Sequence, residues 1–445
     1  MNKDIKDKNK SCPYFKKCGG CQYINLSYEE QLKKKEQTVS RYLKDIAVSQ
    51  HIKIDSIIGS ESAYNYRNKV HSVFGRDGKG KVVRGIYKED SHKIVDIKEC
   101  LLEDKTADAI IEEVKRLLPS FKYKVFDEDT GFGWLRHVLV RKGEKGSSKT
   151  ANNDSEIKKD EKVTKTSEYM LVLVTSSVPF PGKNNFVKAI RTKFPEITTI
   201  VQNINDKRTS MILGDRNIVC YGKGFIEDEL LGLTFRISPN SFYQVNPHQT
   251  SKLYKKAIEY AGDISSKTVI DTYCGTGTIG MCMAEKAKNV IGIELNPSAV
   301  KDAISNAKAN NIKNIEFIKA DATKWMQEYQ GKIKENGDDY VLVMDPPRSG
   351  STEEFITAAS NAGIKNIVYV SCNPETLSRD LKSFIKKKYS VVEITPVDMF
   401  PWTEHVESCV LLERVSNRKA DSYVKLNVKM EDYYRIKDAE KKTDE

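Results

Sequence analysis

The sequence lacks any apolar stretch long enough to cross a bilayer, and its amino terminus mixes Lys with Asp instead of carrying a signal peptide. We therefore expect a cytoplasmic protein with no membrane partner. The chain also lacks a strong excess of one charge, since 73 Lys and Arg stand against 62 Asp and Glu, a net charge of +11. This moderate basic excess fits a nucleic-acid partner without requiring one. Because cytosolic thiols are kept reduced, the nine cysteines are not expected to form disulfides.

Changes in residue pattern divide the 445 residues into four parts. Residues 1–11 are polar and are predicted to be disordered. Residues 12–240 carry short alternating apolar runs separated by glycines, which predict a β-rich central region. Residues 241–415 alternate helical and strand patterns, which indicates an α/β domain with a doubly wound, Rossmann-like sheet. Residues 416–445 form a charged tail with few core-forming side chains.

Three segments of the central region differ from their surroundings. Tyr28 to Ile46 has apolar residues at helical spacing and predicts an amphipathic helix, able to pack on the α/β domain although it precedes the hairpins. Residues 142–167 are rich in Lys, Ser, Asn, Glu and Asp without a hydrophobic period, so we predict a disordered surface insert. Tyr64 to His71 mixes basic and aromatic side chains, which suits either an RNA-binding strand or a solvated hairpin edge.

The α/β part begins with a strand that leads into a glycine-rich loop. Gly275, Gly277 and Gly280 form a G-x-G-x-x-G pattern, and Glu294 ends the next predicted strand. The glycines allow a tight turn and close backbone approach, and the carboxylate can accept both hydroxyl groups of a ribose. By itself this pattern fits either NAD or S-adenosylmethionine.

Two acidic strand ends favour the methyl donor over the dinucleotide. Asp271, at the end of the first strand, suits a cationic sulfonium and repels a pyrophosphate. The fourth strand ends in Asp345-Pro-Pro-Arg348, whose prolines are expected to hold a loop against the cofactor pocket. The strands predicted for this part of the chain are Thr268–Asp271, Asn289–Glu294, Ile315–Lys319, Tyr340–Met344, Ile367–Val370, Val391–Val397 and Ser408–Arg414.

Cys372 directly follows one of these strands and precedes Asn-Pro. This places a thiol at the carboxyl edge of the sheet, where open α/β sheets bind their ligands. A single cysteine is ordinarily a small buried hydrophobe. The cofactor loop before it and Glu407 after it favour a nucleophile here.

A second group of thiols lies near the amino terminus. Cys12, Cys18 and Cys21 fall within ten residues, with Gly-Gly between the last two, and Cys100 is the natural fourth ligand. Clustered cytosolic thiols commonly serve metal or catalysis. The spacing fits tetrahedral zinc and an iron–sulfur centre equally well. The remaining thiols, which are Cys220, Cys274, Cys282 and Cys409, are interpreted as packing residues.

Taken together, five motifs give the chain a specific family resemblance. In their order and approximate spacing they resemble the RNA 5-methyluridine methyltransferases, over nearly everything from Cys12 to Arg414. These motifs are Ser241-Phe-Tyr-Gln-Val-Asn246, Asp271-Thr-Tyr-Cys-Gly-Thr-Gly277, Asp345-Pro-Pro-Arg348, Ser371-Cys-Asn-Pro374 and His405-Val-Glu407. The resemblance implies that Cys372 is the nucleophile and Glu407 the base, and that S-adenosylmethionine is bound by Gln244, Tyr273, Glu294 and Asp345.

The resemblance also carries expectations about cofactor and substrate. Relatives with this amino-terminal cysteine pattern hold a [4Fe–4S] cluster, which implies Cys12, Cys18, Cys21 and Cys100 as its ligands. The same pattern resembles the ribosomal branch of the family, so 23S ribosomal RNA is the expected partner of a monomeric enzyme, with transfer RNA as the alternative. Many members begin with an RNA-binding β-barrel, whereas only eleven residues precede Cys12 here. RNA binding is then expected from the central region and the basic surface.

Uracil-C5 methylation explains why a thiol and a carboxylate are both needed. C5 of uracil is too weak a nucleophile until a thiolate adds at C6, and a base must later remove the C5 proton. Cys372 is therefore expected where its pKa is lowered or where a neighbour can take its proton. Glu407 is the favoured base, Glu404 a competitor, and His405 is interpreted as structural.

Two functions of other classes use part of the same pattern. An NAD-dependent oxidoreductase with an iron–sulfur module would use the glycines, but it leaves Cys372, Glu407 and Asp345 without roles. A non-catalytic RNA-binding protein with a methyltransferase fold would need neither nucleophile nor base. Titration with both cofactors distinguishes the first alternative from a methyltransferase.

Overall fold

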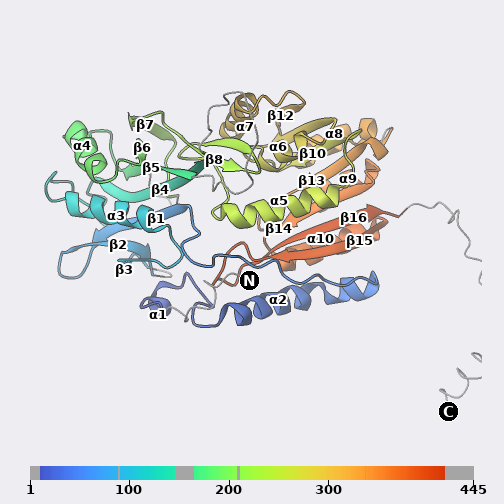
Figure 1. Ribbon diagram of the computed structural model, residues 1–445, viewed down its shortest axis with the longest axis horizontal. Coiled ribbons are helices and arrows are strands. Elements are labelled where there is room, and N and C mark those ends of the chain that lie inside the picture. Colours follow the sequence, from blue (N-terminus) through green and yellow to red (C-terminus); the bar gives the residue numbers. More distant parts are fainter. Residues whose placement is uncertain (1–10, 89–90, 147–164, 208–210, 336, 416–445) are drawn as a thin grey trace, which may run out of the picture. The chain divides into compact units, whose positions relative to one another are not determined.

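Two seven-stranded sheets, one from the first half of the chain and one from the second, organise the protein (Figure 1). The structure is a computed structural model that describes residues 11–88, 91–146, 165–207, 211–335 and 337–415. The predicted disordered amino terminus and the charged tail lie almost wholly outside these residues. Among the described helices, none combines the length and the apolar character that crossing a membrane requires.

The first sheet has the spatial order β3-β2-β1-β4-β5-β6-β7. Its neighbouring strands are antiparallel except for the parallel pair β5 and β6. Helices α3 (Lys105–Leu117) and α4 (Lys183–Lys193) share one apolar core with it. The strands are β1 (Lys69–Arg76), β2 (Val82–Tyr87), β3 (Ile94–Asp96), β4 (Leu135–Gly146), β5 (Lys165–Thr175), β6 (Ile197–Ile204) and β7 (Arg216–Tyr221).

Strands β4 and β5 extend into the segment 142–167, which the sequence predicts to be disordered. Their ladder continues until Gly146 lies opposite Lys165, so the prediction is wrong at both ends of this segment. Side chains at alternate positions of a strand share a face, and Lys142 Nζ lies 2.7 Å from the Glu144 carboxylate. Backbone hydrogen bonds and ion pairs of this kind hold the two strands together without apolar side chains, so the sequence shows no hydrophobic period here. The middle of the segment lies outside the described residues.

The second sheet confirms the predicted α/β fold, in the order β12-β11-β10-β13-β14-β16-β15. Strands β10 to β14 pair in parallel, whereas β16 is antiparallel to both of its neighbours. A separate hairpin, β8 (Ile226–Leu230) and β9 (Leu233–Ile237), precedes it. The strands of the second sheet are β10 (Thr268–Thr272), β11 (Asn289–Glu294), β12 (Ile315–Lys319), β13 (Tyr340–Met344), β14 (Asn366–Ser371), β15 (Tyr389–Val397) and β16 (Glu407–Arg414).

Helices cover both faces of the second sheet, as a doubly wound fold requires. Alternate strand residues contribute to two different cores, one shared with α5, α6 and α7 and the other with α2, α8, α9 and α10. These helices are α2 (Tyr28–Ser49), α5 (Pro247–Ala261), α6 (Thr278–Ala284), α7 (Pro297–Ala309), α8 (Ala322–Lys334), α9 (Glu353–Asn361) and α10 (Pro374–Lys386).

Three helices begin at the same dipeptide, which the sequence repeats as Asn246-Pro247, Asn296-Pro297 and Asn373-Pro374. In each case the Asn side-chain oxygen accepts a hydrogen bond from a backbone N–H of the first turn, and proline suits that turn because its missing N–H is not needed there. The third dipeptide turns the chain into α10 directly after Cys372.

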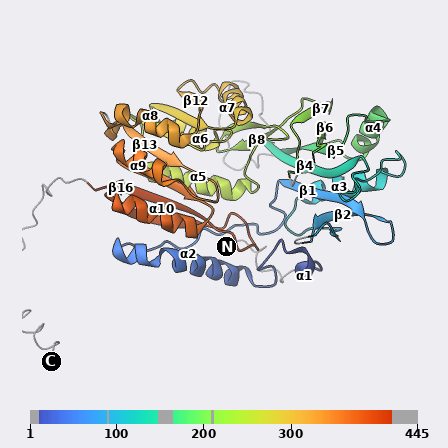
Figure 2. The same cartoon turned by 180° about the vertical axis from the view of Figure 1, so that it is seen from behind.

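Helix α2 comes from the amino-terminal region but packs on the second sheet, beside α10 (Figure 2) and against β15 (Figure 1). Its apolar side chains Val39, Leu43 and Ile46 are buried there, and a capping box at Ser27 starts the helix. Residues up to Arg414 pack as one compact unit. The domain boundary that the sequence places at residue 240 stays a prediction.

Candidate active site

The carboxyl end of β14 carries the half-buried thiol of Cys372. Strand β16 returns antiparallel beside β14, with Ser371 opposite Ser408. This register brings Glu407, the first residue of β16, next to Cys372. The Glu407 side chain is only 4% exposed. The structure therefore brings together the predicted nucleophile and the predicted base from positions 35 residues apart.

Burial and two carboxyl groups determine the electrostatics of the thiol. Burial is the largest cause that raises the pKa of Cys372 to about 11; repulsion from Glu407 and Asp345 contributes to the increase, and Arg348 opposes it. Burial, with a contribution from Asp345, raises the pKa of Glu407 to about 8. Of the two expected environments for Cys372, the lowered pKa is wrong for the free protein, because burial and two carboxyl groups outweigh Arg348; a neighbour that can take the proton stays a prediction. The thiol has to lose its proton to a neighbouring base or to solvent before it can add to a substrate.

The loop after β13 is fixed against the start of α10. The backbone oxygen of Arg348 accepts hydrogen bonds from Asn373 Nδ2, at 3.3 Å, and from Thr376 Oγ1, at 3.2 Å. The Arg348 guanidinium donates to Nδ1 of His405 over 3.2 Å. Because burial and Arg348 both lower the pKa of His405, this ring is neutral and accepts through Nδ1. His405 thus orients an arginine at the site.

Three of the four predicted cofactor residues lie at the carboxyl ends of adjacent strands, β11, β10 and β13. Glu294 Oε2 accepts a hydrogen bond from the Gly275 N–H at 3.0 Å, which fixes the glycine loop on the carboxylate. Tyr273 has a φ of 62° and is half-buried, and its hydroxyl group lies 3.4 Å from Ser351 Oγ. The Asp345 side chain, largely buried, follows β13, and burial raises its pKa to about 7.

The last predicted cofactor residue, Gln244, lies just before α5 and is half-buried. Its backbone oxygen accepts a hydrogen bond from Asn68 Nδ2 at 3.2 Å. Nearby, Thr276 of the glycine loop donates to the Phe242 carbonyl oxygen at 3.4 Å. The segment with Gln244 is therefore joined to the glycine loop. Carboxylates, an aromatic ring and an amide around open glycine backbone form a donor and acceptor set suited to a nucleoside.

Asp271 supports the glycine loop from within the protein. Its side chain is fully buried, and Oδ2 accepts the N–H of Gly280 at 2.8 Å. A Cβ atom at Gly280 would come within 2.8 Å of this oxygen, so only glycine allows the contact. Asp271 Oδ2 therefore fixes the first turn of α6, and the predicted place of Asp271 beside the sulfonium stays a prediction. Burial raises its pKa to about 7.

The four predicted metal-binding cysteines lie close together. Burial, followed by the charges of nearby Cys18 and Cys12, raises the pKa of Cys21 to about 12, and Cys21 in turn raises that of Cys100. Across the described residues, no group of three or more His, Cys, Asp or Glu side chains has the spacing to hold a single metal ion. The arrangement shows a thiol cluster but does not by itself show a metal centre.

Residues 12–23, which we call the cysteine segment, contact the loop that leads to Glu407. Trp402, in this loop, is buried with a φ of 69°, and its ring stacks on Tyr64 with centroids 5.2 Å apart. The backbone oxygen of Trp402 accepts a hydrogen bond from the Tyr23 N–H at 3.0 Å. Gln22 Oε1 accepts the N–H of Glu404 at 3.2 Å. The amino-terminal segment therefore helps to position the loop beside the candidate base.

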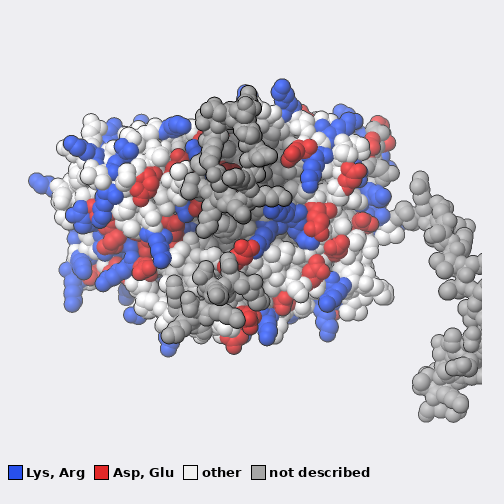
Figure 3. Space-filling view, in the orientation of Figure 1, with Lys and Arg blue, Asp and Glu red and all other residues white. Residues whose placement is uncertain are grey.

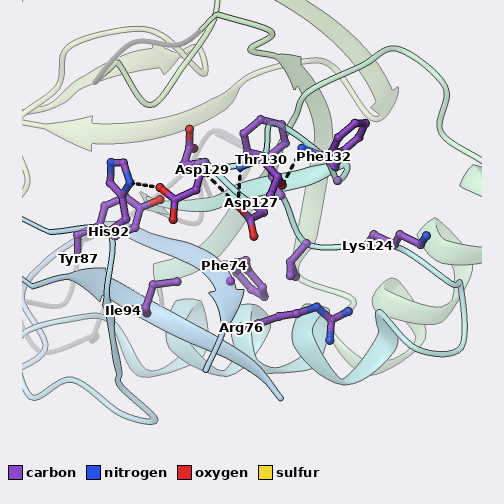
Figure 4. A pocket seen from close by; sticks show the side chains of 15 residues that line it. Phe74, Arg76, Tyr87, His92, Ile94, Lys124, Asp127, Asp129, Thr130 and Phe132 are labelled. Atoms are coloured by element: carbon purple, nitrogen blue, oxygen red, sulfur yellow. Dashed lines mark hydrogen bonds and ion pairs between the residues drawn. The ribbon is translucent and has the colours of Figure 1, made fainter. Parts of the chain in front are cut away.

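A cavity of about 400 Å³, which we call the Cys372 groove, opens in front of the thiol. Cys372, Arg348 and His405 line it, and helix α2 forms another part of its wall. A different cavity, of about 300 Å³, lies by strands β1 and β2 and contains no predicted site residue (Figure 4). There Asp127 accepts N–H groups of its own loop and Asp129 bonds to His92. We therefore assign the chemistry to the Cys372 groove.

Known proteins identify the family to which this site belongs. The family model described as tRNA (uracil-5-)-methyltransferase matches residues 208–415, which include Cys372 and Glu407. An "uncharacterized RNA methyltransferase" of Bacillus cereus is 40% identical over 412 residues, 92% of this chain and 84% of the relative. Another from Clostridium acetobutylicum is 41% identical over 406 residues, 91% and 83% of the two chains. This chain belongs to the RNA uracil-5 methyltransferase family.

A solved structure supports the same conclusion. The tRNA (uracil-54, C5)-methyltransferase of Pyrococcus abyssi, in complex with S-adenosyl-L-homocysteine, superposes with a TM-score of 0.69 at 28% identity. The match covers 91% of this chain and 87% of the archaeal one. The protein is therefore an S-adenosylmethionine-dependent RNA methyltransferase with a Rossmann-like catalytic sheet.

Several groups that shape the methyltransferase site are absent from the sequence-based prediction. Arg348 belongs to a predicted motif, but its effect on the thiol follows only from its position. Tyr23 and Arg41 line the Cys372 groove from the amino-terminal region. Lys35 lies 2.5 Å from Asp398 in a fully buried ion pair that ties α2 to the loop before Glu407. A lysine inside an apolar helix face was the only sequence feature pointing to this pair.

The charges around Cys372 predict how its reactivity changes in two variants. At pH 9, where Asp345 is ionised, Asp345→Asn removes a carboxylate that raises the thiol pKa, so iodoacetamide should alkylate Cys372 faster. Arg348→Gln removes a cation that lowers this pKa, so alkylation should be slower. Each half unit of pKa changes the thiolate fraction about threefold. Mass spectrometry of the Cys372 peptide measures both rates, with the Cys220 peptide as internal control.

Equal rates in the two variants, or the opposite order, would contradict this account of the electrostatics.

Proposed function

We propose that the protein forms 5-methyluridine in RNA by covalent addition of Cys372 to C6 of the target uracil, with Glu407 as the base that removes the C5 proton. The observation that carries the proposal is the register of β14 and β16, which puts a buried carboxyl group beside the thiol. Glu404 is the weaker candidate because its side chain is exposed. A carboxyl group with a pKa near 8 is a stronger base than an exposed one, which suits removal of a carbon-bound proton.

The reaction divides one difficult substitution into steps that these side chains can perform. The thiolate of Cys372 bonds to C6, and the electron pair of the C5–C6 double bond moves into an enolate whose nucleophilic carbon is C5. S-adenosylmethionine supplies the methyl group when bound, and we assign its binding to Gln244, Tyr273, Glu294 and Asp345. Glu407 then takes the proton from C5, the double bond re-forms and the thiolate leaves.

The target base has to leave its stack to reach the Cys372 groove. Phosphate contacts give RNA-binding proteins much of their affinity, whereas base contacts select the site. On the face shown in Figure 3, basic and acidic side chains of the described residues are interspersed. Selection of the uridine is therefore assigned to contacts near the groove, where an unpaired or easily flipped base is bound.

Replacing the two proposed catalytic residues should have different effects. Cys372→Ala should abolish turnover and the covalent complex with RNA that contains 5-fluorouridine, because no thiol remains to add to C6. Glu407→Gln should still add and accept the methyl group but release product slowly, so a denaturation-resistant protein–RNA adduct should accumulate. Electrophoresis under denaturing conditions with labelled RNA detects both outcomes.

Full activity of Cys372→Ala would move the nucleophile elsewhere, with Cys274 next to be tested. An adduct that accumulates in Glu404→Gln and not in Glu407→Gln would transfer the role of base to Glu404.

We further propose that Cys12, Cys18, Cys21 and Cys100 hold a [4Fe–4S] cluster. Their mutual proximity supports this, because a four-iron cluster spreads its thiolate ligands further apart than a single metal ion does. Its role would be structural, since methyl transfer needs no electron and the cysteine segment contacts the loop before Glu407.

Anaerobically purified protein should be brown and contain about four irons per chain. Cys100→Ser should lose most of the iron and the visible absorption, whereas Cys220→Ser, a thiol of the first sheet, should keep both. One equivalent of zinc without visible absorption would keep the site but exclude the iron cluster.

We propose 23S ribosomal RNA as the substrate, on the resemblance of the cysteine pattern to the ribosomal branch. Transfer RNA is the second candidate, favoured by the similarity to the archaeal enzyme that acts on uracil 54 of tRNA. Purified enzyme should methylate protein-free 23S transcript in preference to unmodified tRNA at equal ionic strength, as measured by mass mapping of 5-methyluridine. Preferential methylation of the tRNA T-loop would reverse this assignment, and Cys372→Ala controls for contaminating activity.

A further inference from the structure

The Cys372 groove has a wall that the proposed chemistry does not use. Tyr23, at the end of the cysteine segment, lines the groove together with Cys372 and with Thr38, Arg41 and Tyr42 of helix α2. Three of these four side chains are aromatic or cationic, and Arg41 is exposed. The chemistry proposed for Cys372 and Glu407 does not require these four side chains. The wall therefore has room and chemistry for a part of the substrate other than the reacting base.

Tyr23 and Arg41 line the same groove, to which Glu404 also contributes. The guanidinium carbon of Arg41 is also 4.8 Å from the centroid of the Tyr42 ring. An aromatic surface with an arginine at its edge is the combination that binds single-stranded nucleic acid.

The backbone behind this wall is held in place. The Tyr23 N–H donates to the carbonyl oxygen of Trp402, and the Tyr42 carbonyl oxygen accepts a hydrogen bond from Ser378 Oγ of α10 at 2.8 Å. A buried ion pair between Lys35 of α2 and Asp398, just after β15, adds a third connection. The wall thus keeps its position relative to Cys372 and provides a preorganised binding surface.

We propose that Tyr23 and Arg41 bind the RNA nucleotide next to the target uridine, with the tyrosine ring stacked on its base and the Arg41 guanidinium bonded to a backbone phosphate. The proposal rests on the proposed function, because it takes Cys372 as the group that meets the target uracil. Flipping the target out of its stack leaves the adjacent base without one stacking partner, and the tyrosine ring replaces it. Glu375 and Glu404 also line the groove and repel phosphate, which directs the backbone to the Arg41 end.

Steady-state kinetics on an unmodified RNA fragment that contains the target uridine tests both residues. Tyr23→Leu should raise KM for RNA about tenfold with little change in kcat, because loss of one base–aromatic stack weakens binding by about this factor. Tyr23→Phe keeps the ring and should restore most of the affinity. A purely structural role for Tyr23 would instead lower kcat and the melting temperature together.

Salt dependence tests the phosphate contact. Arg41→Gln should raise KM and reduce the slope of log(kcat/KM) against log salt concentration by about 0.7, the value for one contact to a single strand. Lys332→Gln removes an exposed cation of α8 that does not line the groove, and it should leave KM and slope as in the wild type.

The wild-type enzyme has to methylate the RNA for this comparison. If it does, and both Tyr23→Leu and Arg41→Gln keep the KM and salt slope of the wild type, the wall assignment is overturned and the proposed function stays intact. Absence of 5-methyluridine with the wild-type enzyme would refute the proposed function separately. In that case fluorescence anisotropy with the same RNA still compares the variants, and equal affinities overturn the wall assignment.

Discussion

The antiparallel pairing of β16 with β14 is the constraint on which the active site depends. With Ser371 opposite Ser408, Glu407 lies beside Cys372 at one edge of the sheet. A parallel β16 would carry Glu407 to the far edge, and a register shift of one residue would turn its side chain to the other face. A nucleophile and a base from separate strands thus meet through backbone hydrogen bonds, which position them more rigidly than loops would.

A buried polar cluster fixes the loop before Glu407 in position. Asp398 accepts hydrogen bonds from Tyr28 and Gln31 and pairs with Lys35, all on α2. Leaving a buried charge unpaired costs several kcal/mol, roughly 3–5, so the loop is strongly held on the helix. The amino-terminal region, although distant in sequence, is therefore part of the catalytic architecture. The same helix supplies Arg41 to the Cys372 groove.

The electrostatics of the free site favour the protonated forms of its groups. Burial raises the pKa values of Cys372, Glu407 and Asp345, and repulsion by neighbouring carboxyl groups adds to the increase for Cys372 and Glu407. Each group therefore responds to any positive charge brought into the pocket, since a cation favours the ionised form of thiol and carboxyl alike. Arg348 provides one such charge permanently. The low dielectric that raises these pKa values also strengthens that response.

The sequence by itself determined the strands of the second sheet, the amphipathic helix from Tyr28 to Ile46 and the side chains expected at the site, because hydrophobic period and motif order are local properties. Only the tertiary structure decided that β16 runs antiparallel, that Asp271 lies beneath the glycine loop, that 142–146 joins a ladder, and that Tyr23 and Arg41 line the same groove as the thiol. These features depend on pairing and packing between distant segments, and local spacing contains no information about which segments will meet.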